Sequence, residues 1–424
     1  KILLFTGEIK LPNNVISVIK EEKSICDYEY IKPEPMKAED CSFILFTSGS
    51  TGTPKGLVHT TGGYLTYVNI TFKYVFDYNP GDVFACMADV GWITGHSYIV
   101  YGPLSNGGTI MTFSGTPVYP TPDRYWKMIE EYKITQLYTA PTAIRLLMKY
   151  GNDFTKKYDL STLRILGSVG EPINNEAWNW YNDIGGQKKC FIVDTYWQTE
   201  TGGVICTPLT GIHSQKAGLC VSPFLGIQLI LIDENNKRIT TENTIGKLFI
   251  NSSWPGIART IYKNHERYTN TYFSDGIYDT NDLAMYDRDG DLRILGRSDD
   301  EINVSGHRIS TAEIENILSK YGNIVESAVI GVDDDIKGQG LCCFCVIKDE
   351  MNKRDIDDII IKNIGKFAKP KHIYFVTDLP KTRSGKIMRR ILRKSFTKQW
   401  DTLGDLSTLA NPKIINELKC MFDT

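Results

Sequence analysis

Short apolar segments alternate with polar loops along the first half of the chain. Strands are predicted over the apolar segments at residues 43–46, 83–86, 134–138, 163–166 and 191–193, and an amphipathic helix is predicted at 143–149. Strand, polar loop and helix in repeated order are typical of an α/β fold with parallel strands. Ligands in such folds bind beyond the carboxyl ends of the strands, so we expect the functional residues in the polar loops.

The hydrophobic pattern changes after residue 217. Short alternating segments separated by turns indicate a β-rich subdomain with strands at residues 228–232, 247–251 and 292–295. Farther along, helices are predicted at residues 311–318 and 355–364 and strands at 327–332 and 341–347. We therefore predict a large α/β domain over residues 1–298, whose β-rich subdomain spans about 218–298, and a small α+β domain over residues 299–424.

Composition excludes several classes of protein. The 424 residues include 48 Lys and Arg against 50 Asp and Glu, a balance that argues against a nucleic-acid binder. No apolar run approaches the length of a membrane-spanning helix, so we expect no membrane partner. The ten cysteines include one Cys-x-x-Cys pair, Cys342 and Cys345, inside an apolar run, which indicates buried thiols rather than a zinc site. Scattered thiols predict a cytoplasmic protein, and a nuclear pool is left open.

A loop rich in Ser, Gly and Thr follows the first predicted strand. It runs Thr47-Ser-Gly-Ser-Thr-Gly-Thr-Pro-Lys-Gly56. Its glycines allow close backbone approach, its amides and hydroxyls can surround phosphate oxygens, and Lys55 adds positive charge. It is not a Walker A loop, because Gly52 and Lys55 are separated by only two residues and Gly56 stands where Ser or Thr is required. The loop therefore predicts a phosphate site of another kind.

Seven motifs in order resemble the adenylate-forming enzymes, and within them the acetyl-CoA synthetase branch. Ser48-Gly-Ser-Thr-Gly-Thr-Pro-Lys55 is similar to the AMP-binding signature of this superfamily. The other motifs are Thr60-Thr-Gly-Gly-Tyr64, Asp89-Val-Gly-Trp-Ile-Thr-Gly-His-Ser97, Tyr138-Thr-Ala-Pro-Thr142, Gly167-Ser-Val-Gly-Glu-Pro172, Asp194-Thr-Tyr-Trp-Gln-Thr-Glu-Thr-Gly-Gly203 and Pro380-Lys-Thr-Arg-Ser-Gly-Lys-Ile-Met-Arg-Arg390. The resemblance runs from about Phe43 to Ala410.

The resemblance implies a reaction in two steps. ATP and acetate give enzyme-bound acetyl-AMP and pyrophosphate, and the thiol of coenzyme A then displaces AMP, with Mg²⁺ as cofactor. Members of the family are longer at the N-terminus, so we expect the first part of the large domain to be absent here, which fits the lack of Met at Lys1. The alternatives are a propionate-preferring CoA ligase and a nucleotide-binding fragment without full CoA-ligase activity. The oligomeric state is left open.

The resemblance also implies the nucleotide site. Thr199 binds the α-phosphate, Glu200 holds the Mg²⁺ and Asp282 accepts hydrogen bonds from the ribose. Arg297 reaches the ribose and Arg308 the phosphates. The remaining nucleotide-binding residues are Thr47, Ser48, Gly49, Ser50, Thr51, Gly52, Lys55, Gly170, Glu171, Pro172, Asp194, Thr195, Tyr196 and Gln198.

Trp197 is expected to set the acid specificity, because a large indole leaves room for only a short acyl group. Ile93, Thr94 and Val169 complete the wall of this acyl pocket. One methylene is worth only about 1–3 kcal/mol in a pocket, so propionate is expected to be a poorer substrate and not an excluded one.

The small domain is expected to be mobile about a hinge at Asp299. By resemblance it presents Lys386 to the acetate carboxylate and the α-phosphate in the first step. It then presents the segment with Ser305 and Gly306 to coenzyme A in the second. Relatives carry an Arg-Lys pair for the phosphates of coenzyme A where this chain has Ile361-Lys362, so the contacts to those phosphates are unassigned.

Overall fold

The computed structural model describes residues 2–3, 15–16, 32–47, 54–113, 115–273, 276–298, 301–304, 307–334, 338–382, 386–404, 406 and 409–423, with backbone alone at 301, 303, 307 and 308. The chain divides into two units, residues 1–37 and 38–424. In the first unit, β1 (Ile2–Leu3) and β2 (Val15–Ile16) pair in parallel. Everything below concerns the second unit.

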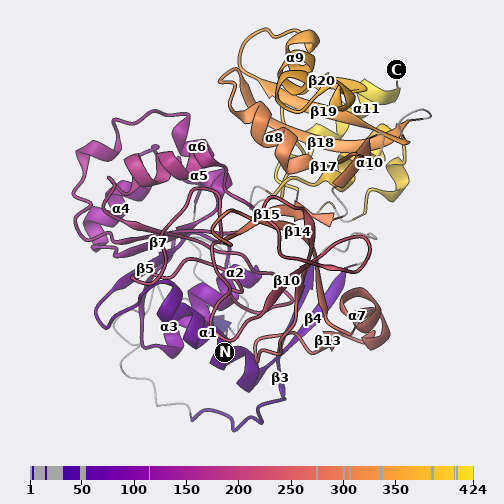
Figure 1. Ribbon diagram of the computed structural model, residues 1–424. Helices are drawn as coiled ribbons and strands as arrows, with labels where there is room; N and C mark the ends of the chain where they lie inside the picture. The colour runs from indigo at the N-terminus through magenta and orange to yellow at the C-terminus, as the bar shows by residue number, and fades with distance from the viewer. Residues whose placement is uncertain are drawn as a thin grey trace. The chain divides into compact units, whose positions relative to one another are not determined.

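A parallel five-stranded sheet lies at the centre of the large part (Figure 1). Its order is β6-β5-β7-β8-β9, and every neighbouring pair is parallel. The strands are β5 (Val83–Cys86), β6 (Thr109–Met111), β7 (Gln136–Thr139), β8 (Ile165–Ser168) and β9 (Phe191–Asp194). The predicted α/β class and four of the predicted strands are therefore confirmed.

Helices cover both faces of this sheet. Ala85, Leu137 and Leu166 pack against one set, namely α4 (Arg124–Tyr132), α5 (Pro141–Met148) and α6 (Asn175–Trp180). Phe84, Cys86 and Tyr138 face the other side and pack against α1 (Thr61–Val75) and η3 (His96–Tyr101). The short helices α2 (Ile93–Gly95) and α3 (Gly102–Ser105) flank η3 in the chain. Successive strand residues therefore point to opposite faces, and both faces are buried. Two further turns are η4 (Thr155–Lys157) and η5 (Tyr181–Gly185).

The predicted strand at residues 43–46 does not belong to the parallel sheet. It forms β3 (Cys41–Thr47), which pairs antiparallel with β4 (Lys55–Thr60) in a separate sheet completed by β13 (Thr260–Ile261). The phosphate loop thus joins two strands of a hairpin and not a strand and a helix. Placing this strand among the parallel strands was wrong, because the loop composition suits either connection and only the pairing of β3 with β4 distinguishes them.

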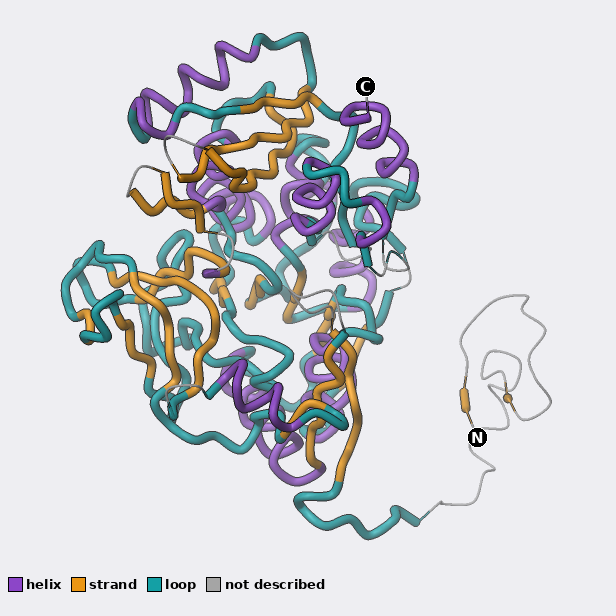
Figure 2. Tube along the Cα trace, turned by 90° about the vertical axis from the view of Figure 1, so that its right-hand side faces the viewer, coloured by secondary structure: helices purple, strands orange, loops and turns teal. Residues whose placement is uncertain are grey.

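The β-rich subdomain is confirmed as an antiparallel sheet of five strands. Its order is β11-β10-β12-β14-β15, and helix α7 (His265–Tyr272) precedes β14. The strands are β10 (Leu229–Ile232), β11 (Arg238–Ile239), β12 (Gly246–Ile250), β14 (Tyr278–Tyr286) and β15 (Leu292–Arg297). Helices and strands are distinguished by colour in Figure 2.

The C-terminal part has a sheet of its own, covered on both faces. Its strands are β16 (Glu301–Val304), β17 (His307–Ser310), β18 (Ile324–Asp334), β19 (Gly338–Ile347) and β20 (His372–Phe375). Cys343 and Cys345 face α8 (Thr311–Ser319) and α9 (Lys353–Asn363), and Cys342 faces α10 (Arg389–Phe396) and α11 (Lys413–Asp423). The predicted buried thiols are therefore confirmed. Short turns form η7 (Lys366–Ala368) and η8 (Trp400–Thr402).

The predicted boundary near residue 299 stays a prediction. Among the described residues, every helix is too short or too polar to cross a bilayer.

The aromatic packing of β5 against α1 gives a test of the core. Phe84 is fully buried, and its ring lies 4.9 Å from that of Phe72 and 4.8 Å from that of Phe76. Phe84→Ala should lower the free energy of unfolding by about 3–5 kcal/mol in urea denaturation, because it removes a buried ring and leaves a cavity. The control Leu65→Ala, on the exposed side of α1, should change it by less than about 0.5 kcal/mol. Equal effects of the two variants would contradict this packing.

Candidate functional site

The loop after β9 starts beside the end of β8. Ser168 and Asp194 are partners in the parallel register, and the Ser168 carbonyl accepts hydrogen bonds from both the backbone N–H (3.0 Å) and the hydroxyl (2.7 Å) of Thr195. Two donors from one residue fix the direction in which the chain leaves the sheet. The residues from 194 to 203, called the strand-end loop below, therefore begin from a rigid position at the carboxyl edge of the sheet.

Three segments far apart in sequence meet around Glu200. Lys55 Nζ lies 3.5 Å from Glu200 Oε1 and donates to the Tyr272 hydroxyl at 2.6 Å, and that hydroxyl donates to Glu200 Oε1. Only about one seventh of each of the Lys55 and Glu200 side chains is exposed. The arrangement holds a lysine and a carboxylate side by side at the base of the phosphate loop.

Electrostatics at this cluster keep the carboxylate charged. Burial raises the pKa of Glu200, but the charge of Lys55 and the hydrogen bond from Tyr272 outweigh it, so the pKa lies below its ordinary value. Burial lowers the pKa of Lys55 in spite of Glu200. Behind the cluster, Nε2 of His59 donates to the Thr199 carbonyl at 2.9 Å. Burial lowers the pKa of this histidine to about 4, so it is neutral at physiological pH.

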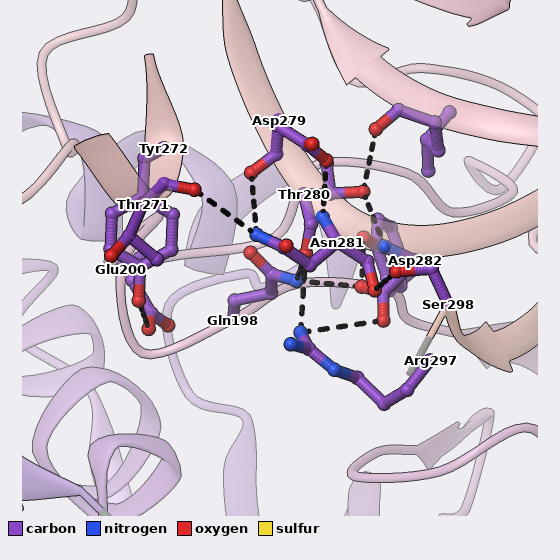
Figure 3. Close-up of polar contacts among 12 residues, drawn as sticks. Gln198, Glu200, Thr271, Tyr272, Asp279, Thr280, Asn281, Asp282, Arg297 and Ser298 are labelled. Carbon is purple, nitrogen blue, oxygen red and sulfur yellow. Dashed lines mark hydrogen bonds and ion pairs between the residues drawn. The ribbon is translucent and has the colours of Figure 1, made fainter. Parts of the chain in front are cut away.

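Asp282 contacts other residues of the strand-end loop (Figure 3). Its Oδ2 accepts hydrogen bonds from the Tyr196 hydroxyl and from Gln198 Nε2, each at 2.6 Å. Its Oδ1 lies 3.7 Å from Nη1 of Arg297, which also donates to the Thr280 carbonyl at 3.2 Å. One carboxylate oxygen is thus saturated by the protein, and the other faces a guanidinium.

Burial also raises the pKa of Asp282, to about 6, against the charge of Arg297 and the hydrogen bonds from Tyr196 and Gln198. The residue before it, Asn281, has φ +56° and caps the preceding turn with its own side chain. Asn tolerates this left-handed conformation better than most residues. Asn281 therefore allows the turn that leads into Asp282.

The phosphate loop itself lies largely outside the described residues. Its ends are fixed, because Thr47 and Lys55 are partners in the β3–β4 register. The Thr47 hydroxyl is buried and has no hydrogen-bond partner among the residues that the structure describes. The end of the loop at Lys55 therefore lies beside Glu200. Ser48, Gly49, Ser50, Thr51 and Gly52 are among the residues that are not described.

Comparisons with known proteins decide the family. The family model of the AMP-binding enzyme matches residues 8–262, and that of the AMP-binding enzyme C-terminal domain matches residues 313–386. The chain belongs to the AMP-binding enzymes. The adenylate-forming resemblance inferred from the motifs is confirmed.

Curated relatives of this AMP-binding enzyme are acetyl-coenzyme A synthetases. The chain is 54% identical over 402 residues to that of Coprinopsis cinerea, covering 92% of this chain and 61% of the relative. It is 52% identical over 424 residues to that of Dictyostelium discoideum, covering 96% of this chain and 63% of the relative. The chain thus spans about three fifths of the length of the curated relatives it matches.

A solved structure is similar to the same AMP-binding fold. The crystal structure of the anthranilate CoA ligase AuaEII in complex with anthranoyl-AMP matches with a TM-score of 0.74 and 27% identity. The match covers 86% of this chain and 69% of that chain.

Trp197 is partly buried against two apolar clusters, each of which contains one of the expected acyl-pocket residues. Its indole packs against one core cluster that contains Val169 and another that contains Ile93, and Thr94 is partly buried in the adjoining turn. The indole meets the ring of Tyr98 edge to face, with centroids 5.1 Å apart. The bulky Trp197 indole therefore lies in the sequence between Tyr196 and Gln198, the two residues whose side chains contact Asp282.

The turn after β8 is held by an ion pair that the motifs did not predict. Arg145 Nη2 contacts Glu171 Oε1 at 2.5 Å, and Thr142 donates to the same oxygen at 2.7 Å. Burial raises the pKa of Glu171, but the charge of Arg145 and these hydrogen bonds hold it below its ordinary value. Gly170 has φ +99°, which favours glycine, and Pro172 is exposed.

Asp194 is buried beneath the strand-end loop. Burial raises its pKa to about 7, and the Cys220 thiol donates to its Oδ2 at 3.9 Å. It lies below the surface, so its expected contact with the nucleotide stays a prediction.

The expected residues of the C-terminal part are only partly described. Lys386 is exposed, and its backbone N–H donates to the Thr382 hydroxyl at 3.1 Å. The charge of Lys386 helps to lower the pKa of Asp282. Asp299, Ser305, Gly306 and the Arg308 side chain lie outside the described residues.

Sequence reasoning missed Tyr272 and His59, which support Glu200 and Thr199. Tyr272 belongs to a helix without a motif, so only the fold could bring it to Glu200. Tyr138, by contrast, lies in a motif that was recognised, but no role was assigned to it.

A separate group of carboxylates does not behave as a metal site. Asp287, Asp289 and Asp291 form the one such group found in the described part of the chain. Lys216 Nζ contacts Asp287 at 2.8 Å and Asp289 at 2.7 Å, and it also contacts Asp291. The lysine supplies the cation that these carboxylates need.

The raised pKa of Asp282 predicts a pH-dependent stability. A folded pKa near 6 against 3.8 unfolded means that the folded state binds the proton more tightly, so this group destabilises the fold as pH rises through that window. Asp282→Asn lacks this effect. Its free energy of unfolding, relative to wild type, should therefore rise by about 2 kcal/mol from pH 4.5 to pH 7.5, measured in urea at each pH. A flat difference for Asp282→Asn would contradict the raised pKa of this carboxyl group.

Proposed function

We propose that this AMP-binding enzyme ligates acetate to coenzyme A at the expense of ATP. Acetate first attacks the α-phosphorus of ATP, which forms enzyme-bound acetyl-AMP and releases pyrophosphate. The thiol of coenzyme A then attacks the acetyl carbonyl carbon and releases AMP. The relatives named acetyl-coenzyme A synthetase support this choice of acid and acceptor.

One observation carries the proposal: a single loop holds polar, apolar and charged side chains close together in sequence. Within six residues of the strand-end loop, Tyr196 and Gln198 hold Asp282, Trp197 forms the apolar wall, and Glu200 pairs with Lys55. A nucleotide, a short acyl group and a phosphate chain must meet at one phosphorus atom in acid activation. This loop brings the matching polar, apolar and charged groups to one edge of the sheet.

The charged cluster suits the phosphates. Lys55 offers a compact cation beside the phosphate loop, which stabilises negative charge as it develops on the leaving pyrophosphate. Glu200 fits Mg²⁺, since this ion uses one or two carboxylates and completes its shell with phosphates and water, and the Glu200 carboxylate is held charged. Bound there, Mg²⁺ neutralises phosphate oxygens. Thr199, next to it, is the proposed α-phosphate contact.

The ribose and the acetate are proposed to contact different residues around the strand-end loop. Asp282 has one oxygen committed to the protein and a second available to accept from a ribose hydroxyl, with Arg297 alongside. Lys386 is the proposed bridge between the acetate carboxylate and the α-phosphate. Its side chain is exposed, as a residue that approaches a substrate must be.

A reducing compartment suits this enzyme. The nine described cysteines are all free thiols, and burial raises the pKa of most of the buried ones, which keeps them protonated. Unpaired thiols of this number support the cytoplasm as the location.

Acetate-dependent exchange of labelled pyrophosphate into ATP tests the first step. We expect exchange that requires acetate, and a loss of at least about 10²-fold in Lys386→Ala, because the variant lacks the cation that stabilises the transition state. The exposed Lys413→Ala is the control and should exchange normally. Thioester formation from supplied acetyl-AMP should be much less affected by Lys386→Ala. Equal loss in both steps would contradict the role of Lys386, and nucleotide binding without exchange would favour a fragment that cannot activate acids.

Replacement of the indole tests the acyl pocket. Trp197→Gly should lower the ratio of kcat/KM for acetate to that for butyrate by at least about tenfold, because each methylene that the opened pocket accepts is worth about 1–3 kcal/mol. Wild type should also prefer acetate to propionate. A preference for propionate would favour a propionate-preferring CoA ligase. An unchanged ratio in Trp197→Gly would contradict the role of Trp197 as the wall of the acyl pocket.

A further inference from the structure

A chain of three hydrogen bonds runs from Trp197 into the sheet. The indole Nε1–H of Trp197 donates to the Tyr138 hydroxyl at 3.2 Å. That hydroxyl lies 2.7 Å from Oγ1 of Thr195, and the Thr195 hydroxyl donates to the Ser168 carbonyl at 2.7 Å. The chain thus connects the apolar wall of the pocket to the carboxyl end of β8.

The chemistry of its two ends fixes the direction of this chain. An indole N–H can only donate and a carbonyl oxygen can only accept. The Thr195 hydroxyl donates to the Ser168 carbonyl, so in its contact with Tyr138 it must accept. The Tyr138 hydroxyl therefore donates to Thr195, and its oxygen accepts from the Trp197 indole. Each of the two hydroxyl groups in this chain thus has one acceptor, and the direction of all three hydrogen bonds is fixed.

The Tyr138 hydroxyl contacts two residues of the strand-end loop, Thr195 and the Trp197 indole. It is fully buried at the end of β7, and its ring packs edge to face on Phe76 (4.7 Å) and Tyr98 (5.8 Å). Tyr98 in turn meets the Trp197 ring from another side. The indole is therefore held by ring packing and by one directional contact, which is the hydrogen bond to Tyr138.

We propose that Tyr138 is a positioning residue that sets the length of the acid accepted, by holding the Trp197 indole in the orientation that shortens the pocket. This rests on the proposed function for the identity of the pocket. The same hydroxyl also hydrogen-bonds Thr195, where the strand-end loop begins. One hydroxyl group therefore holds both the Trp197 indole and the start of the loop that carries the proposed nucleotide contacts. Loss of the hydroxyl removes the acceptor of the indole N–H of the partly buried Trp197, and the indole then turns or shifts to find another.

Tyr138→Phe tests this with the ring packing retained. The matched control is Tyr181→Phe, since Tyr181 is also buried and, within the described part of the chain, its hydroxyl contacts the carbonyls of Leu137 and Gly167, at 3.4 Å each, in the same two strands. We expect Tyr138→Phe to lower the ratio of kcat/KM for acetate to that for propionate by about three- to tenfold. The control should change this ratio by less than about twofold.

A readout without substrate separates this proposal from the proposed function. The indole Nε1–H resonance of Trp197 is assigned by its absence from the ¹H–¹⁵N spectrum of Trp197→Phe. It should shift and exchange faster with deuterium in Tyr138→Phe, and stay in place in Tyr181→Phe. If the protein activates neither acid, the proposed function fails and this resonance alone decides whether Tyr138 holds the indole. An unmoved resonance, or a selectivity ratio within twofold of wild type, would overturn the proposal.

The double variant excludes a merely structural effect. If Tyr138 acts through the indole, Tyr138→Phe should alter selectivity much less in a Trp197→Phe background than in wild type. Equal fold-changes in the two backgrounds would mean that the tyrosine acts elsewhere, and would also overturn the proposal.

Discussion

The double hydrogen bond between Thr195 and the Ser168 carbonyl is the constraint on which the site depends. It anchors the strand-end loop at the point where two parallel strands finish, so the next six residues leave the sheet in a fixed direction. Tyr196 and Trp197 then project to different partners, Asp282 on one side and Tyr138 on the other. A shift of the anchor would move the polar, apolar and charged subsites together, which is why such loops serve as binding edges in α/β proteins.

Three buried carboxyl groups around this loop are treated differently by their surroundings. Glu200 has a cation and a hydroxyl donor, and its pKa is lowered. Asp282 has two neutral donors and a more distant guanidinium, and its pKa is raised to about 6. Burial of Asp194 outweighs the neutral Ser168 hydroxyl and the weak Cys220 thiol donor, and its pKa is raised to about 7. The number and charge of the donors thus decide which carboxyl group is ready to meet a cation and which is close to neutral.

Much of this arrangement could be predicted from the sequence. Apolar segments that end in polar loops located the strands β5, β7, β8 and β9, and local patterning also located the β-rich and C-terminal sheets. Pairing partners depend on contacts far apart in sequence, so the hairpin that carries the phosphate loop was assigned to the wrong sheet. Tyr272 reaches Glu200 from 72 positions away and belongs to no motif. Tyr138 lies in a recognised motif, but the sequence indicated no role for it, because its proposed role depends on which residues its hydroxyl hydrogen-bonds in the fold.

The central claim is that one loop joins a nucleotide site to a short acyl pocket. Calorimetric binding of AMP and of its ethyl and hexyl phosphate esters to the protein tests this without catalysis. The account predicts that the ethyl ester binds more tightly than AMP and that the hexyl ester binds at least about tenfold more weakly than the ethyl ester, because its chain meets the Trp197 indole. Equal affinities for the two esters, or no binding of AMP, would contradict it.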